Sequence, residues 1–259
     1  MPIDKLQLFI TMLIYSLPGM VIGFTLHELM HAVVADRLGD PLPRAQGRLT
    51  LDPLTQIDPL GFGLLYAIGF GFARPVQINT MRIRTDGQRA LVAFAGPATN
   101  LAIAAVCGLA LRVWTHASPS VACPSTGEYI GNACYYDIGQ LPYLGHGGAA
   151  YILFWIVYVT MFVNALLFVF NMIPIPPLDG FQVFKFLFRN VIPDVVGWME
   201  RNAGILAAAG LVLLFILPKT GNNAAGGVIF DGVSHITDFV YGGLPPLYPT
   251  FYTLFQALT

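Results

Sequence analysis

Charged residues are scarce in this sequence. Asp, Glu, Lys and Arg make up 10% of its 259 residues, whereas hydrophobic residues make up 56%. Soluble domains carry about a quarter charged residues, so this chain has too few of them to cover a surface that faces water. The composition therefore predicts an integral membrane protein in a lipid bilayer. The formal net charge of -1 also offers no basic surface, and we expect no nucleic-acid partner.

Cysteine is rare as well. The chain has three cysteines and no CxxC pair, which argues against a metal site built from cysteines. Cys107 lies in an apolar run and is interpreted as a small packing residue. Cys123 and Cys134 fall in residues 115–148, a segment without Lys or Arg. If this segment faces the outside, a Cys123–Cys134 disulfide is predicted; the alternative is two free thiols.

Four apolar runs reach or approach the length of about 20 residues that a membrane-spanning helix needs. They are residues 6–34, 90–114, 149–172 and 204–217, of which the last is short. Of the 13 basic residues, seven lie between the first and second runs and three between the third and fourth, which puts ten on one side. Loops rich in Lys and Arg stay in the cytosol. We therefore expect the N-terminus, residues 115–148 and the C-terminus on the outer side.

Three shorter segments complete the predicted fold. Residues 59–73 are apolar and rich in glycine but too short to cross, which predicts a re-entrant segment. Residues 73–85 alternate between apolar and polar side chains and include β-branched residues. This pattern predicts a strand of a small membrane-associated β-sheet. Residues 244–258 are broken by prolines and rich in aromatics, as at a membrane interface, and whether they span the membrane or lie on it stays open.

These segments predict an α-helical integral membrane protein with about four transmembrane helices, a re-entrant segment and a small membrane-associated β-sheet. No linker or charge run divides the chain, so we expect one domain over residues 1–259. Its core would cover about residues 20–185, and residues 186–259 would add the fourth span and an interfacial tail.

The first apolar run contains HELMH at residues 27–31. On a helix His27 and His31 share a face, so both imidazoles can point at one metal ion, while Glu28 lies about 100° further round, beside the metal. HExxH is the signature of zinc metalloproteases. The alternatives are a chance match and a polar group on a proton or ion pathway. Because an ionisable group at mid-bilayer costs at least about 2.5 kcal/mol, three of them need a compensating interaction such as a metal.

A catalytic zinc site usually has three protein ligands, so a third one is expected elsewhere in the chain. Asp179 is distinctive, because Pro174, Pro176 and Pro177 break the helix just before it. Irregular backbone at membrane depth is tolerated where protein or water covers it. A metal site would provide such cover. The other candidates on the cytosolic half are Asp36, Asp40, Asp52, Asp58, Asp86 and Asp194.

Taken together, these motifs resemble the site-2 protease family of intramembrane zinc metalloproteases, peptidase family M50. Residues 27–31 match the family's HExxH, and residues 171–180 match its NxxPxPxLDG pattern. AGPATN at residues 95–100 is similar to the GPxxN element, and GFARPVQIN at residues 71–79 is similar to the membrane-associated β segment. With no room for a PDZ domain or a CBS domain, the chain resembles a minimal form of the family.

The resemblance implies one Zn²⁺ ion per chain, held by His27, His31 and Asp179. Glu28 would be the general base that takes a proton from zinc-activated water. The implied activity is hydrolysis of peptide bonds in or near the transmembrane segments of membrane proteins. The implied location is a prokaryotic cell membrane, with the active site near its cytosolic side.

The resemblance also names candidate substrate-binding residues. They are Asn171, Asn100, Val76, Gln77 and Ile78. Asn171 would bind the substrate backbone, or else satisfy carbonyls of the broken helix. The segment around Val76 would pair with an extended substrate, or else only with its own sheet.

A non-proteolytic metal or proton carrier with the same polar residues is the main alternative function. The second and fourth runs lack ionisable residues in their middle, which disfavours a carrier. A catalytically inactive relative is disfavoured by the intact Glu28. The physiological substrate, the oligomeric state and the gate that admits a substrate helix are not predicted.

Overall fold

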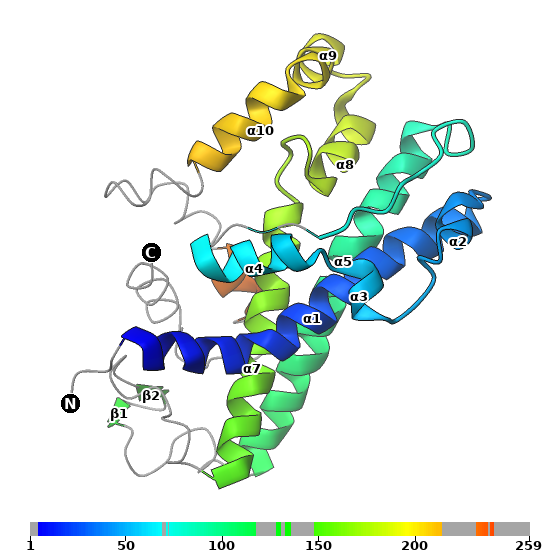
Figure 1. Ribbon diagram of the computed structural model, residues 1–259. Coiled ribbons are helices and arrows are strands. Elements are labelled where there is room, and N and C mark those ends of the chain that lie inside the picture. Colours follow the sequence, from blue (N-terminus) through cyan, green and yellow to red (C-terminus); the bar gives the residue numbers. More distant parts are fainter. Residues whose placement is uncertain are drawn as a thin grey trace.

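The computed structural model describes residues 5–68, 71, 73–117, 128–130, 133–135, 148–213, 232–237 and 239–240. Three long helices form the body of the molecule: α1 (Lys5–Arg37), α5 (Asp86–Ala117) and α7 (Gly148–Asn171) (Figure 1). Each contains a stretch long and apolar enough to cross a membrane, at Leu13–Arg37, Asp86–Ala117 and Ile152–Asn171. The chain reverses its direction from one long helix to the next. The end of α1, the start of α5 and the end of α7 therefore lie toward the same end of the molecule (Figure 1).

The three helices share one apolar core. Its buried side chains include Tyr15, Leu111, Trp155, Tyr158 and Met161. Helix α1 approaches α7 closely at two glycines. A Cβ atom on Gly19 would lie 2.7 Å from the Thr160 Cα, and one on Gly23 would lie 2.7 Å from the Asn164 Oδ1. Small residues spaced by one turn let membrane helices pack this closely, without a side chain between them.

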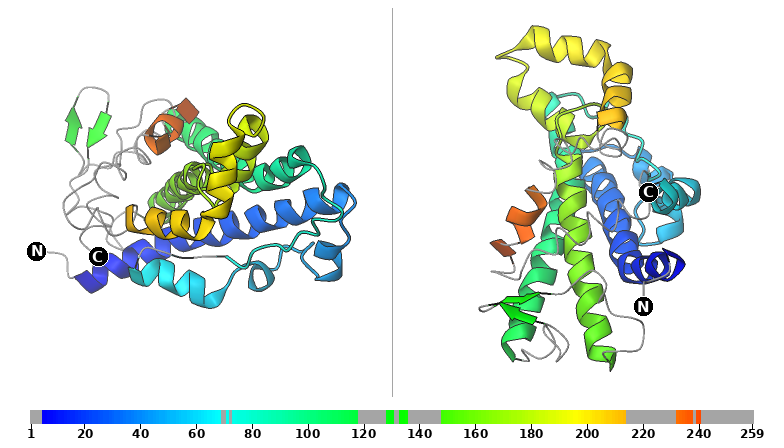
Figure 2. Two further views of the ribbon diagram at one scale, coloured as in Figure 1. Left: turned by 90° about the horizontal axis from the view of Figure 1, so that it is seen from above. Right: turned by 90° about the vertical axis from the view of Figure 1, so that its left-hand side faces the viewer.

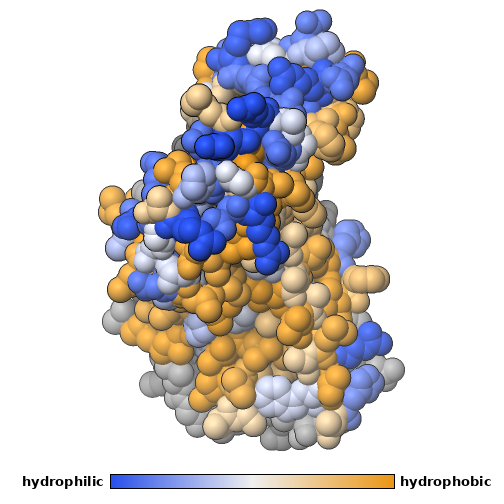
Figure 3. All heavy atoms as spheres, turned by 90° about the vertical axis from the view of Figure 1, so that its right-hand side faces the viewer, coloured by the Kyte–Doolittle hydropathy of each residue, from blue (hydrophilic) through white to orange (hydrophobic). Residues whose placement is uncertain are grey.

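The outer surface of the bundle is largely apolar. Val106, Leu109 and Val113 on α5 and Leu153 on α7 are exposed. Hydrophobic residues cover the middle of the face in Figure 3, whereas hydrophilic residues gather toward the end that carries α8 and α9. Since exposed apolar side chains of this number are costly in water, the surface fits a lipid bilayer. The chain is an integral membrane protein.

Short elements connect the long helices. Between α1 and α5 lie α2 (Leu42–Ala45), α3 (Pro53–Gln56) and α4 (Pro59–Ile68). After α7 come α8 (Asp179–Phe188), α9 (Pro193–Arg201) and α10 (Ala203–Leu211), at the upper end in Figure 1 and in the right-hand view of Figure 2. Between α5 and α7, strands β1 (Glu128–Ile130) and β2 (Ala133–Tyr135) form an antiparallel pair in which Glu128 faces Tyr135.

The prediction of about four transmembrane helices is wrong for the part of the chain that the structure describes, where three helices qualify as candidate spans. The predicted fourth run, residues 204–217, overlaps α10, a helix of 9 residues that residues 212–213 continue as π-helix. Residues 214–217 lie outside the described part.

The predicted membrane-associated β-sheet is also wrong. Residues 73–79 have no regular structure and residues 80–85 form turns and bends. The reason lies in the backbone donors. The Val76 N–H donates to Glu28 Oε2 at 3.2 Å, and the Asn79 N–H donates to Asp40 Oδ2 at 2.7 Å. Side chains of the α1 region thus take hydrogen bonds that a sheet would need.

That residues 59–73 enter the membrane and return stays a prediction; the regular part of this segment that the structure describes is the helix α4. It packs on α1, where the rings of Phe24 and Phe62 meet edge to face with centroids 6.3 Å apart.

Two predictions concern residues outside the described part. Cys123 lies there, so the Cys123–Cys134 disulfide stays a prediction. Residues 244–258 lie there too, and their placement at the membrane interface stays a prediction as well.

Candidate metal centre

The two histidines of HELMH lie one turn apart on α1 and face α5 and α8. Their ring centroids are 4.6 Å apart, and the rings are nearly perpendicular at 82°. Both residues are buried, His27 at 6% and His31 at 7% relative exposure. The i, i+4 spacing therefore produces what helix periodicity predicts, two imidazoles directed into one space.

Asp179 is the first residue of α8, and the irregular segment after α7 brings it back to the histidines. This segment folds on itself: the Ile175 N–H donates to the Ile173 carbonyl at 2.8 Å and the Leu178 N–H to the Ile175 carbonyl at 2.9 Å. Gly180 is needed next to Asp179, because a Cβ there would overlap the Met172 carbonyl. The N-terminus of α8 can thus lie directly against the end of α7.

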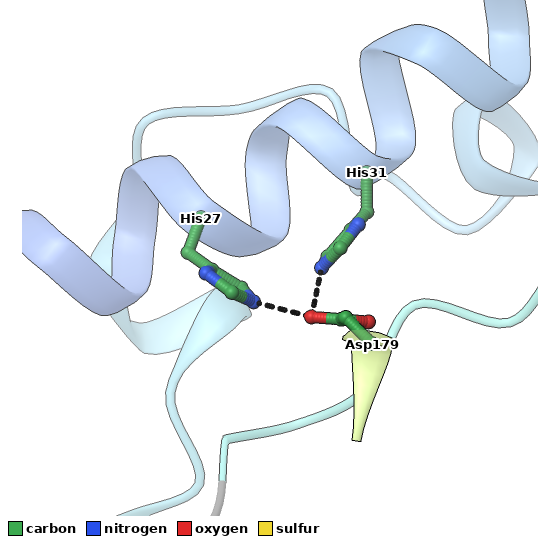
Figure 4. Close-up of side chains that lie close together, drawn as sticks. All are labelled: His27, His31 and Asp179. Atoms are coloured by element: carbon green, nitrogen blue, oxygen red, sulfur yellow. Dashed lines mark hydrogen bonds and ion pairs between the residues drawn. The ribbon is translucent and has the colours of Figure 1, made fainter. Parts of the chain in front are cut away.

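Three potential ligand atoms converge at this point (Figure 4). Asp179 Oδ2 lies 3.2 Å from His27 Nε2 and 3.3 Å from His31 Nε2, and all three atoms lie within 4.8 Å of one another. Two ligand atoms bound to one tetrahedral zinc ion at about 2.1 Å would lie about 3.4 Å apart. The donor set and its spacing therefore fit a zinc ion.

The carboxylate of Asp179 is ionised at neutral pH. Burial by itself raises the pKa of this carboxyl, but hydrogen bonds from His27 and His31, when both imidazoles are protonated, lower it to well below its usual range; a bound metal would take the place of the protons on Nε2. An anionic oxygen is the form that binds a metal cation.

The other nitrogen of each imidazole has a partner that fixes the ring. His31 Nδ1 lies 2.7 Å from the Val92 carbonyl, which can only accept, so this nitrogen carries the hydrogen. His27 Nδ1 lies 2.6 Å from Asn100 Oδ1. Such outer partners orient metal-binding histidines and leave Nε2 with its lone pair. Both Nε2 atoms are thereby turned toward Asp179.

Gly96 on α5 leaves the space that the imidazoles occupy. A Cβ atom there would overlap His31 Nε2 and lie 2.7 Å from His27 Nε2. The close approach at Gly96 is therefore to the two imidazoles.

Glu28 is buried and held by two groups. Its Oε2 accepts the Val76 N–H at 3.2 Å and lies 3.6 Å from Arg48 Nη2. Arg48 is buried too, and donates to the carbonyls of Thr55, at 2.7 Å, and of Arg74. Burial lowers the pKa of the Arg48 guanidinium, but a guanidinium stays charged at neutral pH. Arg48 was missed at the sequence level, since a single Arg in a polar connection has no motif.

The other candidate third ligands have different partners. Asp40 is fully buried and accepts from the backbone N–H groups of Leu42 and Asn79. Asp36 pairs with Arg44 at 2.7 Å. In the described part of the chain, His27, His31 and Asp179 form the group with the arrangement of a metal site.

The predicted substrate-binding residues lie in three places. Asn100 is fully buried behind His27. Asn171 Nδ2 donates to the Leu167 carbonyl of its own helix at 2.9 Å. Gln77 is exposed and accepts from Gln46 Nε2 at 2.7 Å, and Ile78 is half-buried.

Comparisons with known proteins identify relatives over most of the chain. Three curated relatives share the description "Putative zinc metalloprotease". YwhC of Bacillus subtilis (strain 168) is 32% identical over 205 residues, which cover 79% of this chain and 81% of that protein. Rip2 of Mycobacterium tuberculosis (strain ATCC 25618 / H37Rv) is 28% identical over 228 residues, covering 84% of this chain and 74% of the relative. MJ0611 of Methanocaldococcus jannaschii is 28% identical over 194 residues, covering 73% and 81%.

No solved structure matches the chain significantly. The model of one protein family, described as peptidase family M50, matches residues 15–217, which include all three residues of the candidate metal centre. The resemblance seen in the motifs is thus confirmed over most of the sequence. This chain belongs to peptidase family M50.

Proposed function

We propose that the chain is a zinc endopeptidase of the site-2 type, which hydrolyses peptide bonds in or near transmembrane segments of membrane proteins. One observation carries the proposal: two imidazole Nε2 atoms and a carboxylate converge within an apolar helical bundle, and Glu28, the residue after His27, is buried as well. The family and the descriptions of the relatives support the metal and the activity.

In this proposal His27, His31 and Asp179 hold one Zn²⁺ per chain. When bound, zinc supplies an acidified water and polarises the scissile carbonyl. Glu28 takes a proton from the attacking water and delivers it to the nitrogen of the departing amine. The Val76 N–H and Arg48, both on Oε2 of Glu28, restrict this carboxylate to one position.

The substrate would approach from the side of Asp179. The side chain of Asp179 is 23% exposed, whereas those of His27 and His31 are 8% and 9% exposed. The segment of Val76, Gln77 and Ile78 reaches the site through the contact of the Val76 N–H with Glu28. We propose that this segment contacts the substrate in an extended form, because a helix hides its own peptide bonds.

The site would lie near the cytosolic side of a prokaryotic cell membrane. His27 and His31 belong to the second half of α1, which ends at Arg37. Arg44 and Arg48 follow in the connection to α5. Loops rich in Arg and Lys stay in the cytosol, which supports this orientation.

Metal removal tests the proposal directly. Purified protein in lipid nanodiscs is expected to cleave a model transmembrane substrate, to lose this activity when a chelator removes zinc, and to regain it when zinc is added back. Substrate cleavage followed on a gel, with zinc content measured in parallel, checks this. Cleavage that persists in protein depleted of zinc would exclude a zinc mechanism, and zinc binding without cleavage would favour the carrier.

The space at Gly96 gives a second prediction. In Gly96→Ala the new methyl group overlaps the imidazoles of His31 and His27, so these rings must leave their positions. Zinc affinity is expected to fall by at least about tenfold, as for other lost supports of a metal ligand. Gly63→Ala on α4 is the matched control, since a Cβ there meets nothing within 4 Å. Equal zinc affinity of Gly96→Ala and the wild type would show that the imidazoles do not occupy this position.

A further inference from the structure

Two fully buried asparagines connect the middle of α7 to His27. Asn164 on α7 and Asn100 on α5 both have 0% relative exposure. Asn100 Nδ2 donates to Asn164 Oδ1 at 2.9 Å, and Asn100 Oδ1 lies 2.6 Å from His27 Nδ1. A bundle in lipid offers these amides no bulk water, so their polar atoms depend on one another and on nearby backbone for partners.

The α7 end of this chain of amides determines which way each amide points. Asn164 Nδ2 lies 2.9 Å from the Thr160 carbonyl and 3.3 Å from the Gly19 carbonyl, and carbonyl oxygens only accept. The nitrogen of Asn164 must therefore face these carbonyls, which leaves its Oδ1 to accept from Asn100 Nδ2. The oxygen of Asn100 is then the atom that faces His27, and His27 Nδ1 must donate.

We propose that Asn164 is a positioning residue for the metal centre: through Asn100 it fixes His27 in the form that carries hydrogen on Nδ1 and a lone pair on Nε2. The inference rests on the proposed zinc site. Without the Asn164 oxygen, the Asn100 amide keeps one other bond from Nδ2, to the Gly23 carbonyl at 3.3 Å. A rotated amide would present its NH₂ group to Nδ1, and His27 would then carry its hydrogen on Nε2, where a metal cannot bind.

Asn164→Leu tests this role, because leucine has a similar size and no polar atom. Zinc affinity of the full chain is expected to fall about tenfold, at the low end of the range for a lost outer partner, since the bond to Gly23 remains. A competition titration with a chromophoric chelator measures it. Thr160→Val is the matched control on the preceding turn, because its hydroxyl donates to the Ile156 carbonyl at 2.7 Å and takes no part in the chain of amides. Its zinc affinity is expected to stay at the wild-type value.

A second substitution separates positioning from packing. In the Asn164→Leu background, Asn100→Asp gives His27 a carboxylate whose two oxygens both accept, so any rotation preserves the hydrogen on Nδ1. Zinc affinity is expected to return to within about threefold of the wild type, whereas lost packing at Asn164 would not be rescued from position 100. If Asn164→Leu does not fold, Asn164→Ala, which is too short to reach Asn100, replaces it.

The outcomes are distinct. Wild-type zinc affinity in Asn164→Leu, or a loss that Asn100→Asp does not restore, would overturn the positioning role and leave the zinc site in place. A wild-type protein that binds no zinc would overturn the proposed function, and the positioning role with it.

Discussion

Glu28→Gln is expected to keep its zinc and to cleave a model transmembrane substrate about 10²- to 10⁴-fold more slowly, the usual contribution of a general base. Glutamine has the same size and retains an oxygen for the Val76 N–H, which now donates to Glu28 Oε2 at 3.2 Å. Its amide cannot take a proton from water at neutral pH. Single-turnover cleavage measures the loss, and zinc content shows that the centre is still assembled.

Glu200→Gln on α9 is the matched control for the loss of one carboxylate. Glu200 pairs with Lys185, so this variant removes a charge from an ion pair that includes none of the proposed ligands. Its cleavage rate is expected to stay close to that of the wild type. Equal cleavage by Glu28→Gln and the wild type would exclude Glu28 as the base. Loss of zinc from Glu28→Gln would instead assign Glu28 to holding the centre together.

The two histidines could be placed from the sequence because their relation is local. An i, i+4 pair on one helix has a fixed geometry, whatever the rest of the chain does. Asp179 lies 152 residues from His27, and its proximity was an expectation drawn from the prolines before it. The structure brings these three side chains together, while their role as zinc ligands stays a proposal.

The irregular connection between α1 and α5 was harder to predict. Alternation and β-branched residues at 73–85 are typical of a strand, but a strand also needs free donors and acceptors. In this protein Glu28 and Asp40 accept the N–H groups of Val76 and Asn79. Such competition depends on side chains from elsewhere in the fold, so the local sequence pattern cannot predict it.

The hydrogen-bond partners behind the histidines illustrate two different limits of prediction from the sequence. The Val92 carbonyl is a backbone atom, which any residue at that position supplies, so no sequence pattern marks it. Asn164, by contrast, can be recognised in the sequence, because it is a single amide in the apolar run TMFVNALLFVF. A polar side chain in a membrane helix needs a partner, and this could have drawn attention to it. The identity of that partner, Asn100 on another helix, required the structure.

Asp179→Asn is expected to lower zinc affinity by more than the roughly 10- to 100-fold that a lost outer partner costs, because it changes a direct ligand. The amide has the shape of the carboxylate but no charge, and the two imidazoles would be left as the main ligands. Zinc should then no longer raise the unfolding temperature of the protein. Zinc at 100 times its dissociation constant stabilises a native state by about 2.7 kcal/mol, so thermal unfolding with and without zinc detects the loss.

The control for Asp179→Asn must account for the position of Asp179 in the first turn of a helix. An acidic residue there stabilises a helix by about 0.3–1 kcal/mol through its dipole, whether or not it binds a metal. Asp194 lies in the first turn of α9 and is exposed, so Asp194→Asn removes a comparable helix-end charge away from the histidines. If both variants unfold at slightly lower temperature and only Asp179→Asn loses the zinc-dependent rise, the carboxylate of Asp179 is a ligand. If Asp179→Asn retains that rise in full, its closeness to His27 and His31 reflects ion pairing alone, and the third ligand must be sought elsewhere in the chain.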